Sequence, residues 1–185
     1  IAGCSTKKSI TNAHLDDLYD CTRLTENERD EAINAGKLIC KLVGNEVRIC
    51  RGVTSFVTTT STKGDSYKKI RLVMIQDILA NSLFETLDEY RGQLTGNYDN
   101  RVNLLSEINK FLDDCVKDEY IASGKAEFDI ELIKAYLKSK GIDISVLTDD
   151  AILRYNTGTQ FFALITMKQL DTLEDFTLNI NHSEV

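Results

Sequence analysis

The chain is organised around the stretch NTGTQFFALITMKQLDTLEDFTLNI, which spans Asn156 to Ile180. Two segments in it have the composition of β-strands, Phe161–Lys168 and Phe176–Ile180, and a polar, acidic connection separates them. In the second segment apolar and polar residues alternate, which gives a strand one apolar and one polar face. Such a strand at the end of a chain needs a sheet to pair with. We expect that sheet to include other copies of the same protein.

The composition is that of an ordinary globular domain. With 185 residues, 42% of them hydrophobic, the chain is long enough to bury a core, and we expect one domain over residues 1–175 followed by an arm over residues 176–185. The net charge of -7 argues against a nucleic-acid partner, because such binding depends on clustered Lys and Arg. No apolar run approaches the roughly 18 residues of a membrane span. The five cysteines include no closely spaced pair, which argues against a disulfide framework and a zinc site.

A short helix is predicted to follow an irregular segment over residues 1–24. The hydroxyl of Thr25 can accept a hydrogen bond from the backbone of Glu28, whose carboxylate can reach back to the Thr25 amide. The helix should extend to about Ala35, with Gly36 beyond its C-terminus.

A β-hairpin is predicted next. Its strands, Lys37–Val43 and Glu46–Arg51, are separated by Gly44-Asn45, two residues that tolerate the positive φ of a tight turn. A two-residue loop sets the register. It pairs apolar residues across one face, Leu42 with Val47 and Cys40 with Ile49.

Helical periodicity begins near Ser66 and continues through most of the remaining chain. The spacing predicts a long helix ending near Gly92, a second amphipathic helix ending at Gly124, a third over 130–140 capped by Asp129, and a short one from Thr148 to about Tyr155. Because strands and helices are segregated, the fold class is α+β. We expect a small, mostly antiparallel sheet, made of the hairpin 37–51 and strands near 161–168 and 176–180. It should pack against two long antiparallel helices and the shorter ones.

Few residues suggest chemistry. His14 lies near Asp16, Asp17 and Cys21, a grouping that a metal or thiol site could use, but the signal is weak and a solvated loop histidine is the favoured interpretation. Phosphate-binding, dinucleotide-binding and nucleophile-turn motifs are absent from the sequence. We therefore predict no catalytic residue, metal or cofactor, and no enzyme.

One cluster of basic residues precedes and begins the longest predicted helix: Lys63, Lys68, Lys69 and Arg71. In an acidic protein such a cluster is either a solvated face or a docking surface for an acidic partner.

Three stretches carry a resemblance to a known family: VRICRGVTSFVTT from Val47, KKIRLVMIQDILANSLFETLDEYRGQLTGNYDNRVNLLSEINKFL from Lys68, and the closing stretch from Asn156. Together they resemble the C-terminal region of tail sheath proteins from phages and from phage-tail-like bacteriocins. The resemblance covers nearly the whole chain.

The resemblance implies a structural subunit of a contractile tail sheath. Such subunits form stacked six-membered rings around an inner tube, contract together, and drive the tube through a target envelope. The implied location is a virion tail or tail-like particle assembled in the cytoplasm of the bacterial host. The implied partners are other copies of the chain and the tube protein, with no direct nucleic-acid contact and no membrane insertion. Further domains are expected upstream, because the family's other arm comes from its N-terminus.

In this family terminal arms add strands to the sheets of neighbouring subunits. Carried over to this chain, the resemblance makes Phe176, Leu178 and Ile180 the donated arm, with a flexible hinge over residues 170–175. The accepting sheet would include Val47, Ile49, Phe162 and Leu164. Charge alone suggests that Lys68, Lys69 and Arg71 face the tube. Two alternatives remain open: a non-polymerising adaptor or scaffold of a contractile particle, and an enzyme with its site near His14.

Overall fold

The structure is a computed structural model that describes residues 8–181. Its contacts group the chain into two compact units. The hairpin unit comprises the described residues up to Ile75 and those from Asp171 onward, and the helix–sheet unit comprises Gln76–Leu170. The chain leaves the first unit within α2 (Ile70–Tyr90) and returns to it after Leu170.

In the hairpin unit, α1 (Glu26–Asn34) begins where the sequence predicted it to begin. The Thr25 side chain accepts from the Glu28 amide, and the Glu28 carboxylate accepts from the Thr25 amide at 2.8 Å, so the predicted capping box is confirmed. Gly36 follows with a φ of +71°, and a Cβ there would lie 2.8 Å from the backbone oxygen of Thr54. Both the turn and the close approach therefore require glycine.

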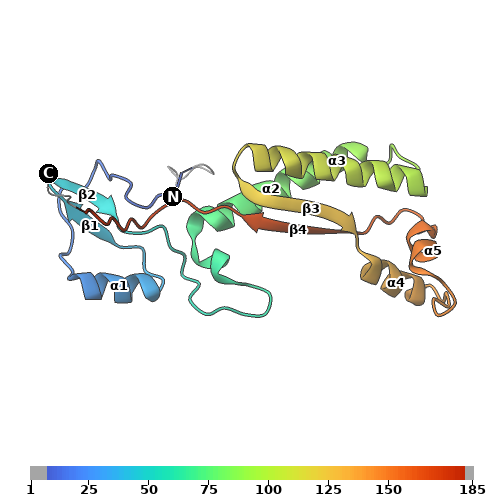
Figure 1. Ribbon diagram of the computed structural model, residues 1–185, viewed down its shortest axis with the longest axis horizontal. Helices are drawn as coiled ribbons and strands as arrows, with labels where there is room; N and C mark the ends of the chain where they lie inside the picture. Colours follow the sequence, from blue (N-terminus) through green and yellow to red (C-terminus); the bar gives the residue numbers. More distant parts are fainter. Residues whose placement is uncertain (1–7, 182–185) are drawn as a thin grey trace. The chain divides into compact units, whose positions relative to one another are not determined.

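The hairpin consists of β1 (Cys40–Val43) and β2 (Glu46–Ile49), drawn in cyan in Figure 1. Its register is the predicted one, with Cys40 opposite Ile49 and Leu42 opposite Val47. The other edge of β2 is covered by the segment before α1, which the sequence predicted only as irregular. The backbone NH groups of Asn12 and Leu15 donate to Ile49 and Val47, each at 2.9 Å.

A 3₁₀ turn, η1 (Asp65–Lys68), leads into α2, the longest helix. Three apolar residues at the start of α2 are buried, Leu72, Ile75 and Leu79, whereas Phe84 in its second half is 67% exposed. Between residues 8 and 181 no helix is both long enough and apolar enough to cross a bilayer.

In the helix–sheet unit, α3 (Tyr98–Lys117) packs along β3 (Ile121–Phe128), which pairs antiparallel with β4 (Ala163–Gln169) (Figure 1). The predicted strand 161–168 is confirmed as β4, although it begins two residues later. The predicted extension of the second helix to Gly124 is wrong. The helix ends at Lys117, Glu119 has a positive φ of 62°, and the chain turns into β3.

The strand β3 was not predicted, because its sequence, IASGKAEF, contains mostly residues of low strand propensity. Its position is set by contacts with distant residues. The amide side chain of Asn109 on α3 donates to the Ala126 oxygen and accepts from the Ala126 nitrogen, each at 2.9 Å. A Cβ on Gly124 would lie 3.1 Å from the Cβ of Leu112, so the missing side chain lets helix and strand approach closely.

Two short helices, α4 (Ile130–Ser139) and α5 (Asp149–Arg154), complete this unit. The predicted cap of α4 is confirmed, because the Asp129 side chain accepts from the Leu132 amide. The Thr148 side chain likewise caps α5 by accepting from the Ala151 amide. A small core forms between them from Ile133, Leu137 and Ile152.

The α+β class is confirmed, and the strand pairs are antiparallel as predicted. The single expected sheet is wrong in its composition. The described residues form two separate two-stranded sheets, β1–β2 and β3–β4, because β4 takes the unpredicted β3 as its partner. Residues 176–180 are assigned to no strand.

Candidate functional site: an anchored C-terminal arm

The carboxylate of Glu174 is buried in the hairpin unit, with its side chain only 7% exposed. It accepts hydrogen bonds from the hydroxyls of Thr11 at 2.7 Å and Ser9 at 3.1 Å. It also forms ion pairs with Lys69 at 3.1 Å and Arg51 at 3.4 Å. Four groups from three distant parts of the sequence therefore converge on one carboxylate.

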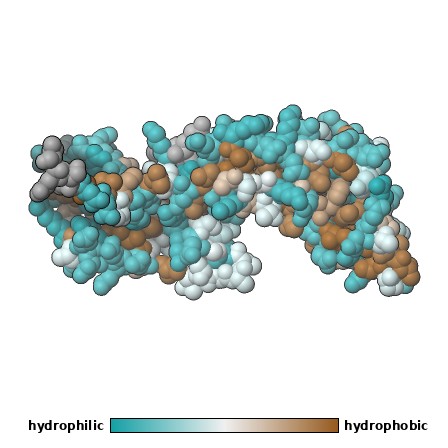
Figure 2. All heavy atoms as spheres, viewed as in Figure 1, coloured by the Kyte–Doolittle hydropathy of each residue, from teal (hydrophilic) through white to brown (hydrophobic). Residues whose placement is uncertain are grey.

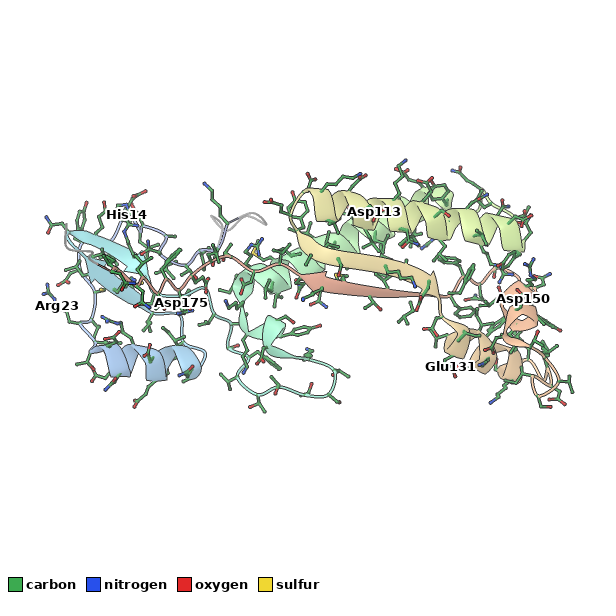
Figure 3. All side chains as sticks on the ribbon, viewed as in Figure 1. His14, Arg23, Asp113, Glu131, Asp150 and Asp175 are labelled. Atoms are coloured by element: carbon green, nitrogen blue, oxygen red, sulfur yellow. The ribbon has the colours of Figure 1, made fainter. Side chains whose placement is uncertain are left out.

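Two more acidic residues of the same segment join this cluster. Lys69 also pairs with Asp171, and Arg51 also pairs with Asp175, which Figure 3 labels. Two cations thus hold three carboxylates. We call residues 171–175 the arm root and the five charged side chains the root cluster.

The cations of the root cluster are held in their charged forms. Burial lowers the pKa of Lys69, but its hydrogen bonds to Asp171 and Glu174 outweigh burial and leave that pKa above its usual value. The hydrogen bond to Asp175 raises the pKa of Arg51. Both cations therefore stay charged across the neutral range.

The expected flexible hinge over residues 170–175 is not what the structure shows. Three of its side chains are fixed by ion pairs within the hairpin unit, and one of them is buried. Breaking such a buried pair leaves uncompensated charge, so the segment is anchored.

Beyond the root, residues 176–181 form what we call the arm. Its three alternating apolar side chains are largely exposed: Phe176 at 75%, Leu178 at 80% and Ile180 at 75%. Large apolar side chains exposed in a row are typical of a segment that binds another surface. Residues 182–185, which the sequence analysis included in the arm, lie outside the described residues.

The same unit contains a strand edge that has no backbone partner among residues 8–181. The backbone groups of Val47 and Ile49 form hydrogen bonds with the segment Asn12–Leu15, on the side of β2 away from β1. In an antiparallel ladder, Val47 and Ile49 therefore form non-hydrogen-bonded pairs with their partners on β1. It follows that the backbone groups of their partners, Cys40 and Leu42, point away from β2. Neither has a backbone partner among the described residues, so β1 presents an open edge.

The four residues predicted to accept an arm lie in two different units: Val47 and Ile49 in the hairpin unit, Phe162 and Leu164 in the helix–sheet unit. Val47 and Ile49 are buried in β2, whose two edges are already covered. Phe162 packs against Tyr136, with ring centroids 5.4 Å apart, and Leu164 lies on β4. The open edge of β1 was missed, although the predicted register already determined which of its backbone groups point outward.

The predicted tube-facing cations have other surroundings. Lys69 belongs to the root cluster, and Arg71 is only 5% exposed, too buried to face a partner. Lys68 pairs with Asp65 at 2.9 Å and keeps 41% of its side chain exposed. The structure therefore divides the cluster: Arg71 is buried and Lys69 is paired within the hairpin unit, whereas Lys63 and much of Lys68 are exposed.

His14 lies in the hairpin unit (Figure 3), where its Nδ1 is 2.8 Å from the carboxylate of Asp16. Its backbone forms an isolated antiparallel β-bridge with Arg48 of β2. Among residues 8–181 no three His, Cys, Asp or Glu side chains form a group that could hold a metal. His14 thus sits in the segment that covers β2.

Comparisons with known proteins show which proteins the chain resembles. No family model matches the sequence. The chain is 31% identical over 182 residues to the tail sheath protein of Clostridium phage phiCD119, which covers 97% of this chain and 51% of that relative. The chain therefore spans about half the length of the curated relative that it matches.

Two solved structures share the fold. A sheath tail protein from Desulfitobacterium hafniense matches with a TM-score of 0.58 and 20% identity, over 69% of this chain and 32% of that one. The sheath tail protein Lin1278 from Listeria innocua matches with a TM-score of 0.60 and 16% identity, over 92% of this chain and 40% of that one. The resemblance to phage tail sheath proteins is thereby shown.

Proposed function

We propose that this chain, which resembles tail sheath proteins over nearly its whole length, is the C-terminal region of a contractile tail sheath subunit. The subunit polymerises around an inner tube and contracts to drive the tube through a target envelope. The observation that carries the proposal is an apolar arm held by an anchored root in the same unit as an open strand edge. Polymerisation and contraction are properties of a whole subunit. The curated relative is about twice as long as this chain.

The arm links neighbouring copies by adding a strand to β1. The outward backbone groups of Cys40 and Leu42 would hydrogen-bond to the arm of the next copy. The three apolar side chains of the arm would be buried at the same time, and each large apolar side chain that is fully buried contributes about 1.5–3 kcal/mol. The acceptor is therefore β1, in place of the four residues that the sequence suggested.

The root cluster attaches the arm firmly to the hairpin unit. Because Glu174, Asp171 and Asp175 are bound to Lys69 and Arg51, tension on the arm is carried into the hairpin unit. The function is thus a linkage that survives while subunits move, and it requires no reaction.

Electron microscopy of the full-length subunit tests this function. Intact subunits should form long tubes, and a variant truncated after Asp175 should form none. The matched control is truncation after Asn181, which keeps the arm and should still form tubes. Tubes from the variant lacking the arm would refute strand donation. Rings of fixed size from the intact protein would instead identify a non-polymerising adaptor.

A further inference from the structure

A short segment before α1 contacts both β2 and the arm root, and we call its residues 9–15 the strap. Three backbone hydrogen bonds of 2.9–3.0 Å join the strap to the edge of β2 that faces away from β1. Arg48 adds a side-chain bond to the Asn12 oxygen at 3.2 Å. Ile10 is the only buried side chain of the strap, at 4% exposure, and hydrophilic residues cover most of the hairpin unit on the face drawn in Figure 2. A few hydrogen bonds and one apolar contact therefore hold the strap.

The hydroxyl of Thr11 joins three distant segments of the chain at one oxygen. It donates to the Glu174 carboxylate at 2.7 Å and accepts from the Gly52 amide at 2.9 Å. Ser9 supports the same arrangement, because its oxygen accepts from the Thr11 amide at 3.1 Å and its hydroxyl donates to Glu174 at 3.1 Å. Both hydroxyls that hold the buried carboxylate of the arm root therefore belong to the strap.

Gly52 provides the space in which the strap lies. The residue is buried, and a Cβ there would lie 2.9 Å from Cγ1 of Ile10 and 3.3 Å from the hydroxyl oxygen of Ser9. Because glycine has no side chain, the strap can pack directly on the backbone that follows β2. The position of the two hydroxyls therefore depends on this residue as well.

The strap and the arm root should stabilise each other. If the strap leaves β2, Glu174 loses both hydroxyl donors and keeps only Lys69 and Arg51, whose side chains are 32% and 33% exposed. If the carboxylate is removed, the two hydroxyls lose their acceptor. Such a coupling is reciprocal, so a change in either segment should loosen the other. A segment with few buried apolar contacts can also open without unfolding the rest of the unit.

We propose that the strap is a latch through which the chain before Ser9 controls the arm. While the strap lies on β2, its hydroxyls hold the arm root and the edge of β2 is closed. When the strap is drawn away, the root is loosened, and the backbone groups of Val47 and Ile49 become free to pair with another strand. Ser9 and Thr11 are positioning residues, because they act on the arm through Glu174. The latch goes beyond the proposed linkage, since it acts within one subunit and can be tested without assembly.

Amide hydrogen exchange in the unassembled full-length protein tests the effect of the root on the strap. Glu174→Ala should speed the exchange of the Asn12 and Ile49 amides at least about tenfold, although Glu174 bonds to neither. Glu174→Gln keeps an acceptor oxygen and should have a smaller effect. The amides of Lys41 and Val43, which face β2 from β1, are the internal control and should change less. Unchanged exchange at Asn12 and Ile49, or equal acceleration of both sets, would overturn the proposal.

Variants of the strap test the reverse effect, with carbodiimide labelling of the Glu174 carboxylate as the readout in mass spectrometry. Thr11→Val removes the hydroxyl but keeps the shape, and it should speed this labelling at least about threefold, whereas Thr11→Ser keeps the hydroxyl and should not. Gly52→Ala should act like Thr11→Val, because it displaces the strap without removing a hydroxyl. The exposed carboxylate of Asp114 is the control and should be labelled equally in all proteins. Equal labelling of Glu174 in the Thr11→Val and Thr11→Ser proteins, or an unchanged rate in Gly52→Ala, would overturn the latch.

Discussion

Glu174 is the residue on which the arm root depends. Its carboxylate is buried, and two hydroxyls and two cations contact it. A buried charge is stable only when it is paired and hydrogen-bonded, and here both conditions are met.

Glu174→Gln should lower the free energy of unfolding by about 1–3 kcal/mol, because the amide cannot balance Lys69 and Arg51. Urea denaturation followed by circular dichroism measures the change. The control is Asp114→Asn, which breaks an exposed pair with Lys117 and should have no measurable effect. Equal effects from the two variants would show that the root cluster is not an anchor.

Sequence reasoning succeeds at the residue scale where partners are neighbours in the chain. The capping box of Thr25 and Glu28 and the turn at Gly44 follow from local spacing, and the structure confirms both. The partners of Glu174 are more than 100 residues away, and nothing near Glu174 in sequence distinguishes it from an exposed acid. The root cluster therefore could not be predicted.

At the scale of elements, the main difference concerns β3. The sequence predicted a helix that continued to Gly124, but pairing with β4 and packing on α3 make this segment a strand. The apolar pattern of β4 is clear by itself, whereas β3 depends on both of its neighbours. Because β3 was not predicted, β4 was assigned to the wrong sheet.

Gly124→Val should destabilise the protein by about 1–3 kcal/mol despite valine's higher strand propensity, because a Cβ there already meets Leu112 and Ile121 at 3.1 and 2.9 Å. Thermal unfolding measures this change. Ser123→Val, at an exposed position of the same strand, is the control and should be tolerated. If both variants are equally stable, the close contact between α3 and β3 is wrong.

At the scale of the whole molecule, the structure changes the linkage that we propose. An anchored root stands where the sequence suggested a flexible hinge, and the proposed acceptor is the edge of β1 that is open among the described residues. The family resemblance and the alternating arm were both readable from the sequence. The acceptor was not, because it depends on the N-terminal segment covering β2, a contact between residues more than 30 positions apart.

The most direct test of strand donation is amide hydrogen exchange in β1, compared between assembled and unassembled full-length subunits. We predict that the amides of Cys40 and Leu42 become at least about tenfold more protected on assembly, because they gain hydrogen bonds from a neighbour's arm. The amides of Lys41 and Val43, which already face β2, serve as internal controls and should change less. Unchanged exchange at Cys40 and Leu42 in assembled tubes would contradict the account.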